Sequence, residues 1–252
     1  MNNRMIAREP TFCDPVLAET ITSACNCSPL VARALIRRGV SSAEDRVRRA
    51  IDAGEHICVF GDYDADGVCS TAMLVQRLQK MGASVEYYIP HRHSEGYGMS
   101  ADAVRLLHSR GVQLIITVDN GVSAYDEIAL CNALGIDVVV TDHHSVGKTI
   151  PECVAVVAAS RKDATYPNRY LCGAGVALKL IQALNDGAYS QEELALAAVA
   201  TIADVVPLTG ENRVIAACGL RYISSLTGLS ALLRAAGFNQ PRVDEMTVSF
   251  MI

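Results

Sequence analysis

The stretch Ile57–Gly67 reads Ile-Cys-Val-Phe-Gly-Asp-Tyr-Asp-Ala-Asp-Gly and joins an apolar run to three aspartates spaced two apart. Four consecutive apolar residues followed by a polar turn are typical of a short strand that is buried on both faces of a parallel sheet. Carboxylates crowded at the end of such a strand repel one another, and a folded chain tolerates them where cations bind. The stretch therefore predicts a parallel sheet with a metal site at a strand end.

Strand and helix patterns alternate along the rest of the first 160 residues. Glycines at positions 82, 111 and 135 end the amphipathic helices that separate the first four strands. This alternation predicts an α/β fold, in which a parallel β-sheet carries helices on both faces. The expected strands are 56–61, 84–89, 112–118, 136–141 and 153–158.

Helical patterns flank this central part. Ser28-Pro29 opens a helix that Gly39 ends, and the capping box Ser41–Glu44 opens a second helix. After residue 160 the chain is mainly helical, with a capping box at Ser190–Glu193. The residues 247–252 alternate polar and apolar side chains and are expected to form a strand.

The composition is that of an ordinary globular chain. Its 252 residues are half apolar and carry a net charge of −5, which gives no sign of a nucleic-acid-binding protein that is basic overall. We expect no membrane segment, because no apolar run is long enough to span one and the first ten residues lack the apolar centre of a signal peptide. Nine scattered cysteines without a CxxC pair predict reduced thiols in a cytoplasmic protein. The arginines of segment Arg33–Arg49 are expected to line a solvated helical face.

Polar clusters follow two more of the expected strands. Asp119-Asn120-Gly121 follows one strand, and Asp142-His143-His144 follows the next. Because the carboxyl ends of parallel strands meet at one edge of a sheet, we expect these clusters and the three aspartates to form a single site. Asp204, which interrupts the apolar run 202–206, is a candidate to complete it. Carboxylates alone suit Mg²⁺, and added imidazole shifts the preference towards Mn²⁺.

An EF-hand loop and a solvated turn both fit the three aspartates less well than a strand-end metal site does. An EF-hand loop also begins Asp-x-Asp-x-Asp-Gly, but here Met73 stands where the bidentate glutamate belongs, and a strand precedes the loop. A solvated turn would account for isolated aspartates, but it does not account for two further polar clusters that also lie at strand ends.

Two segments are candidates to bind phosphate. Gly173-Ala174-Gly175, at a helix start, could present backbone N–H groups to a phosphate, although close helix packing explains the glycines equally well. Arg92, in the polar and glycine-rich loop Pro90–Gly98, is a candidate phosphate clamp, and an ordinary surface loop fits the composition nearly as well.

The chain resembles the DHH phosphoesterase superfamily. The resemblance lies in four blocks that occur in the superfamily's order: Val59–Gly67, Thr117–Gly121, Val140–His144 and Ala203–Pro207. The loop Pro90–Gly98 and the block Cys172–Ala177 resemble the RecJ-like exonucleases, a subfamily specific for single-stranded DNA.

The resemblance implies a two-metal phosphodiesterase that binds Mn²⁺ or Mg²⁺ and degrades single-stranded DNA from its 5′ end to 5′-mononucleotides, in DNA repair and recombination. Asp119 would bridge the two ions and, with His143 and His144, carry the chemistry. Asp142 would orient its neighbours. The implied metal ligands are Asp62, Asp64, Asp66, Asp119, His143 and Asp204, and the implied substrate-binding residues are Arg92, His144, Gly173 and Gly175.

We further expect a helical segment over 1–54, a DHH catalytic domain over 55–225, and over 226–252 the start of a connection to a C-terminal domain that this chain lacks. Without that domain the chain is expected to bind DNA weakly. The expected form is a cytoplasmic monomer whose partners are single-stranded DNA and a single-strand-binding protein or helicase. Two alternatives stay open: a phosphatase of oligoribonucleotides, cyclic dinucleotides or pyrophosphate, and a non-catalytic replication scaffold.

Overall fold

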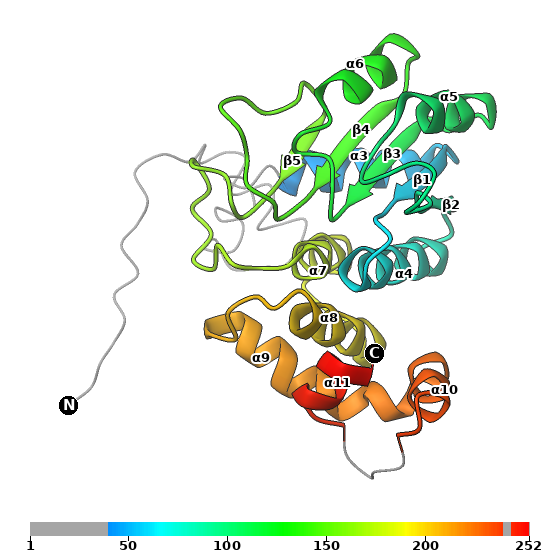
Figure 1. Cartoon of the computed structure of the whole chain (residues 1–252). Coiled ribbons are helices and arrows are strands. Elements are labelled where there is room, and N and C mark those ends of the chain that lie inside the picture. The colour runs from blue at the N-terminus through cyan, green and yellow to red at the C-terminus, as the bar shows by residue number, and fades with distance from the viewer. Residues whose placement is uncertain (1–39, 239–242, 252) are drawn as a thin grey trace.

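Five parallel strands form the centre of the computed structural model, which describes residues 40–238 and 243–251 (Figure 1). Their order is β2-β1-β3-β4-β5, so the chain leaves β1 for one edge of the sheet and returns to build the other edge from β3. In such a sheet, ligands bind beyond the carboxyl ends of the two strands where the order reverses, here β1 and β3. All five predicted strands are present: β1 (His56–Phe60), β2 (Ser84–Tyr88), β3 (Leu114–Val118), β4 (Asp137–Thr141) and β5 (Ala155–Val157).

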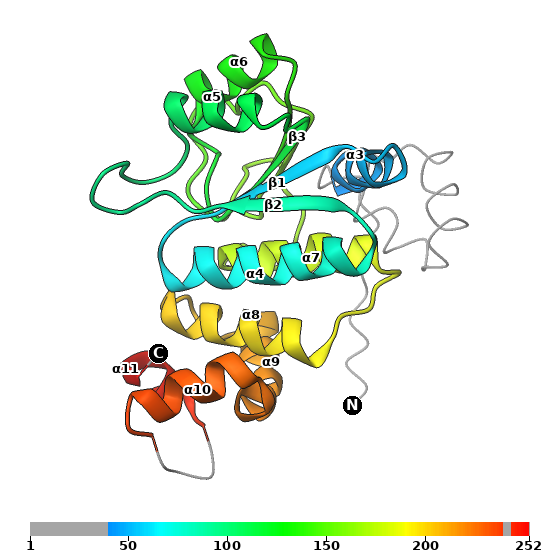
Figure 2. The same ribbon diagram turned by 90° about the vertical axis from the view of Figure 1, so that its right-hand side faces the viewer.

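Helices cover both faces of the sheet, as predicted (Figure 2). Helices α4 (Ala65–Lys80) and α7 (Gly173–Leu184) lie on one face, where they bury Ile57 and Val59 of β1. Helices α5 (Ala101–Ser109) and α6 (Tyr125–Ala133) lie on the other face, where they bury Cys58 and Phe60. Helix α3 (Val40–Asp52) belongs to the α4/α7 side and packs against α7 and β5.

A further helical layer lies beyond α4 and α7, and Figure 2 shows it stacked under them. Helix α8 (Gln191–Ala203) packs on α4 and α7, and the chain continues through α9 (Gly210–Gly219), η1 (Leu220–Ser225), α10 (Thr227–Ala235) and α11 (Glu245–Met251). The predicted capping box is confirmed, because Ser190 and Glu193 each accept the other's backbone N–H. Among the described residues no single helix is long and apolar enough to cross a membrane; only the bent pair 210–225 and 227–235 passes on length and composition.

Two expectations about chain ends are wrong. The residues 247–251 belong to helix α11, where Asp244 accepts bonds from the N–H and hydroxyl of Thr247 and Val248 is buried. Helix α3 begins at Val40, so Ser41 lies inside the helix rather than before its first residue. A short alternation carries little information, and packing against neighbouring elements decides short helices. The helix expected over residues 28–39 lies outside the described residues.

The predicted solvated arginine face is wrong for Arg46, whereas the Arg48 side chain is 39% exposed, and Arg33, Arg37 and Arg38 lie outside the described residues. Arg46 is buried and binds Glu55 at 2.6 Å and Asp137 at 2.5 Å, both of which lie at the amino ends of strands. Arg48 donates to the carbonyl oxygens of Ala183 and Leu184 at the end of α7. This side of α3 therefore fastens the helix to the sheet and to α7, whereas Arg49 is exposed.

Candidate metal centre

The turn from β1 into α4 carries three carboxylates, and ligand oxygens of two of them, Asp62 and Asp64, lie within 4.8 Å of each other. Asp64 is the N-cap of α4 and accepts the Gly67 N–H at 2.9 Å, so the helix begins immediately after it. Asp62 and Asp66 are buried, whereas Asp64 is exposed. Gly67 allows the turn to close, because a Cβ at this position would lie 2.5 Å from the Asp62 carbonyl oxygen.

Asp119 follows β3 in a left-handed backbone conformation, with φ at 62°. Non-glycine residues adopt this conformation rarely, at a cost of about 1–3 kcal/mol, and such strain concentrates at functional sites. Asn120 offsets the cost, since its amide donates to the carbonyl oxygens of Phe60 and Val118 and ties the ends of β1 and β3 together. The Tyr97 hydroxyl donates to the carbonyl oxygen of Asp119 itself, at 2.9 Å.

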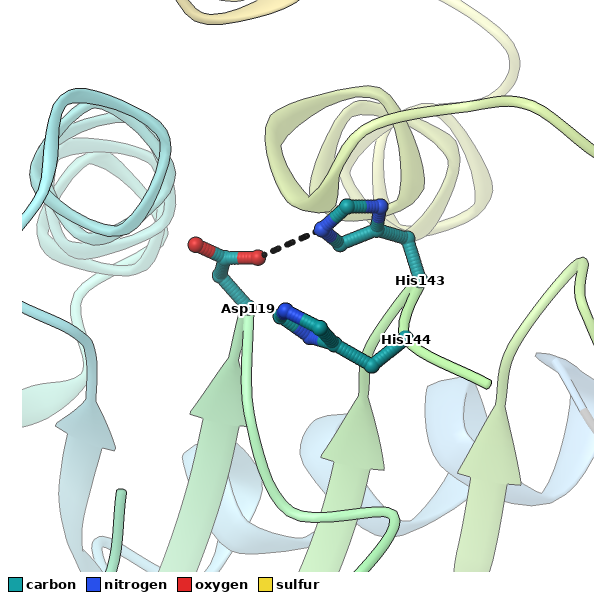
Figure 3. Close-up of side chains that lie close together, drawn as sticks. All are labelled: Asp119, His143 and His144. Carbon is teal, nitrogen blue, oxygen red and sulfur yellow. Dashed lines mark ion pairs between the residues drawn. The ribbon is translucent and has the colours of Figure 1, made fainter. Parts of the chain in front are cut away.

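His143 lies at the middle of the cluster, after β4. Its Nε2 is 3.1 Å from Asp119 Oδ1, the ion pair drawn in Figure 3. The same Nε2 is 3.8 Å from Asp66 Oδ2, and Nδ1 is 3.7 Å from Asp204 Oδ2. Asp204 is the C-cap of α8, so the helical layer beyond α4 and α7 supplies one side chain. Within residues 40–238 and 243–251, three donor sets have their ligand atoms within 4.8 Å of one another: Asp62, Asp64 and Asp119; Asp119, His143 and His144; and Asp66, His143 and Asp204.

Asp142 supports this cluster from behind and belongs to none of the three sets. Its Oδ1 accepts the backbone N–H groups of His143 and His144 and the Nδ1–H of His144, at 2.7, 3.0 and 2.8 Å. Its Oδ2 accepts the Val122 N–H at 3.0 Å. The carboxylate thereby fixes the turn that carries both histidines and orients the half-exposed His144 ring.

The electrostatics of the cluster favour a cation. Burial raises the pKa of Asp119 to about 10, and the charges of Asp66 and Asp64 add to the shift. Burial likewise raises the pKa values of Asp62, Asp66 and Asp204. Asp62 Oδ1, Asp119 Oδ1 and Asp204 Oδ2 are buried and accept no hydrogen bond. Buried acceptors without donors are costly, and divalent cations bind such oxygen and imidazole sets, so these residues fit a Mn²⁺ or Mg²⁺ centre.

The pKa of Asp142 is lowered, in contrast to those of the four aspartates above. Burial alone would raise the pKa of its carboxyl, but the bonds from the His144 side chain and from the backbone of His144 and Val122 outweigh burial and lower the pKa. The same bond raises the pKa of His144. The bond between Asp142 and His144 therefore favours the ionised aspartate and the protonated histidine at the rim of the cluster.

These shifts predict a pH dependence for the metal-free chain. A carboxyl whose folded pKa lies above its ordinary value of 3.8 stabilises the fold at low pH, and that contribution is lost as pH rises towards about 10. In EDTA, the free energy of unfolding of the wild type should therefore fall between pH 5 and pH 9 relative to that of Asp119→Asn, as measured in urea. Mn²⁺ should reverse the trend, because metal binding needs ionised ligands. A difference between the two chains that does not change with pH would contradict this prediction.

The loop after β2 brings two more side chains to the cluster. The Arg92 guanidinium lies 5.0 Å from the centre of the Tyr63 ring. Tyr63 stands between Asp62 and Asp64 in the sequence. The Tyr97 hydroxyl lies 3.2 Å from His144 Nδ1. Sequence reasoning did not single out Tyr97 or Asn120. Two features of the sequence could have pointed to them: Tyr97 stands between two glycines, and Asn120 directly follows an aspartate at a strand end.

The glycines at the start of α7 have a different role from the one expected. The N–H groups of Gly173 and Ala174 donate to the two carboxylate oxygens of Asp66, at 2.6 and 2.7 Å, and the Gly175 N–H donates to Cys172 Sγ. The positive end of the helix thus stabilises the buried Asp66 carboxylate, and these donors already have protein partners. The alternative of close packing fits Gly173, where a Cβ would lie 2.6 Å from both Cβ and Oδ1 of Asp119.

Gly173→Ala should therefore weaken metal binding without unfolding α7. Alanine is the best helix former, but its methyl group would displace the Asp119 carboxylate, and we expect the affinity for Mn²⁺ to fall at least about tenfold. The matched control is Gly228→Ala in α10, where a Cβ would meet no atom within 4 Å. Electron paramagnetic resonance of free Mn²⁺ measures the affinity, and circular dichroism checks the helix content. Equal affinities in the two variants would contradict the prediction.

Comparisons with known proteins agree with the geometry. Residues 56–205 match the model of the DHH family, N-terminal domain. The chain is 40% identical over 262 residues to the single-stranded-DNA-specific exonuclease RecJ of Bacillus subtilis (93% of this chain, 33% of the relative). It is 41% identical over 212 residues to RecJ of Thermus thermophilus, which covers 82% of this chain and 31% of that relative. It thus spans about a third of these relatives' length.

Solved structures give the same picture. Exonuclease RecJ bound to manganese superposes with a TM-score of 0.77 at 38% identity, over 84% of this chain and 55% of that chain. RecJ of Thermus thermophilus in complex with Mn²⁺ superposes with a TM-score of 0.72 at 31% identity, over 96% of this chain and 38% of that chain. These relatives bind Mn²⁺ on the same fold.

Proposed function

Because the chain belongs to the DHH family, we propose that it is a metal-dependent phosphodiesterase that hydrolyses single-stranded DNA from the 5′ end to 5′-mononucleotides. One observation carries the proposal: buried oxygens of Asp62, Asp119 and Asp204 that accept no hydrogen bond gather with His143 at the point where the strand order reverses. The activity of these RecJ relatives supports the choice of substrate, and the proposed roles are in DNA repair and recombination.

Six side chains would hold two Mn²⁺ or Mg²⁺ ions: Asp62, Asp64, Asp66, Asp119, His143 and Asp204. Asp119 occurs in two of the three donor sets, which supports a bridging role for its carboxylate. The mixture of carboxylate and imidazole favours Mn²⁺. When bound, such ions neutralise charge on a phosphoryl group and lower the pKa of a coordinated water.

Other side chains would handle the substrate directly. His144 is half-exposed and would donate to a non-bridging phosphate oxygen, and its raised pKa favours the protonated form for that role. Arg92, exposed above Tyr63, would bind a phosphate oxygen beside the cluster. Asp142 would hold both histidines in place. Gly173 would serve the site by allowing α7 to approach Asp119.

The surroundings of the reaction are also proposals. We place the protein in the cytoplasm, which the free thiols of the six cysteines in the described residues support. We propose a monomer with its catalytic domain over 55–225, which meets single-stranded DNA together with a single-strand-binding protein or helicase. The net charge of −5 supports weak DNA binding by this chain alone.

The test is the degradation of 5′-labelled single-stranded DNA with Mn²⁺ and with EDTA, beside duplex DNA, a dinucleotide and pyrophosphate. We expect metal-dependent release of mononucleotides from single strands only. Turnover of the dinucleotide or pyrophosphate without DNA hydrolysis would instead assign the chain to the small-phosphoester phosphatases. A chain that binds no Mn²⁺ and hydrolyses none of these substrates would favour the scaffold.

A further inference from the structure

Residues 89–98 form the loop between β2 and α5 that carries Arg92 and Tyr97 to the metal centre. Side chains 91–97 are exposed, and Gly96 and Gly98 adopt left-handed backbone conformations, with φ at 82° and 76°. Little apolar burial is therefore available to fix this loop. Its shape has to come from hydrogen bonds.

Glu95 takes part in three of those bonds. One carboxylate oxygen accepts the His91 N–H at 2.7 Å, and the other accepts the hydroxyl of Tyr88. The Glu95 N–H donates back to the His91 carbonyl oxygen at 2.9 Å, which closes residues 91–95 into one turn. Tyr88 ends β2 and stacks on Phe60, which ends β1, with ring centroids 5.1 Å apart. Glu95 thus ties the turn to the carboxyl ends of two strands.

An acidic side chain in a loop that meets a polyanion needs an explanation. Facing the substrate, it would repel the phosphates. Here both oxygens are directed towards donors within the protein, and the two bonds lower the pKa of Glu95, led by that from Tyr88. Among the described residues, Glu95 takes part in none of the metal-donor sets.

We propose that Glu95 is a positioning residue for substrate binding, which closes the loop and so holds Arg92 above Tyr63 and Tyr97 against Asp119 and His144. This inference rests on the proposed function, because it takes a phosphodiester as the ligand of Arg92. A loop ordered before binding spares the complex the entropy cost of ordering it. The prediction is that loosening the loop weakens substrate binding while the metal ligands keep their own contacts.

The first measurement is amide hydrogen exchange of residues 91–98 in the metal-free chain. Glu95→Gln is nearly isosteric but can no longer accept both bonds, and we expect exchange there to quicken about tenfold. Tyr88→Phe removes one donor and should give a smaller change at the same amides. The matched control is Glu86→Gln on the same strand, whose carboxylate pairs with Arg110 and His56 away from the loop. Unchanged exchange in Glu95→Gln would overturn the proposal.

The second measurement separates binding from chemistry. With 5′-labelled single-stranded DNA and Mn²⁺, Glu95→Gln should raise KM about tenfold and change kcat less than about threefold, with Mn²⁺ affinity unchanged. An unchanged KM, or a loss confined to kcat, would overturn the proposal. If the wild type does not hydrolyse DNA, the proposed function fails separately, and fluorescence anisotropy of the same oligonucleotide with Ca²⁺ replaces KM under the same criterion.

Discussion

Asp119→Ala should abolish metal-dependent hydrolysis, with kcat lowered at least about a thousandfold, while the chain stays folded. The substitution removes an oxygen ligand shared by two donor sets, and a metal centre supplies several kcal/mol of transition-state stabilisation. The fold should survive, because the carboxylate that is lost is buried, has a raised pKa and accepts no hydrogen bond at Oδ1, whose nearby nitrogen is His143 Nε2 at 3.1 Å. Removing it relieves an electrostatic cost in the metal-free chain.

The experiment measures kcat on single-stranded DNA, Mn²⁺ affinity and urea unfolding for the same preparations. Asp126→Asn, in the first turn of α6 and exposed, is the control and should match the wild type in all three. Activity within tenfold of wild type in Asp119→Ala would exclude this carboxylate from the chemistry. A large loss of stability in EDTA would show instead that Asp119 holds the fold together.

The second large effect concerns stability rather than catalysis. Arg46→Ala should lower the free energy of unfolding by about 3 kcal/mol. The Arg46 side chain is only 8% exposed and binds Glu55 and Asp137, so alanine leaves Glu55, 21% exposed, without its cation. Asp137 is half-exposed, and water can solvate it, which keeps the loss at the lower end of the range for broken buried pairs.

Urea unfolding in EDTA tests this without interference from the metal. Arg49→Ala, on the exposed side of the same helix, should change the free energy of unfolding by no more than about 0.5 kcal/mol. Equal losses in the two variants would mean that helix propensity, not the ion pair, governs the result. Glu55→Gln in the Arg46→Ala background should recover part of the loss, since it removes the uncompensated charge.

Local pattern predicted the sheet and the location of the site well. The runs ending at Phe60, Val118 and Thr141 are apolar enough to be buried on both faces, and the polar residues after them had to meet at one edge. Caps such as Ser190 were also predictable, because a capping box is a contact within four residues.

What escaped prediction depends on contacts between distant segments. The left-handed Asp119 is held by bonds from Asn120 to Phe60, sixty residues earlier in the chain. The N–H of Gly173 meets Asp66 because α7 and α4 lie side by side, which no local pattern reveals. Arg46 looks like a surface residue until α3 is placed against the ends of β1 and β4. The roles of the six proposed ligands came from a family resemblance, which carries information on distant contacts that periodicity lacks.

Asp204 connects the cation to the cooperativity of unfolding. It lies at the end of α8, which packs on α4 and α7. A bidentate salt bridge between Arg77 and Glu193 also joins α8 to α4. A bound cation would therefore act as a crosslink between the sheet and the outer helices, worth about 2.7 kcal/mol at a metal concentration one hundred times Kd. In a chelator, we expect the outer helices to open at a lower free energy than the sheet, and with metal bound we expect both parts to unfold together.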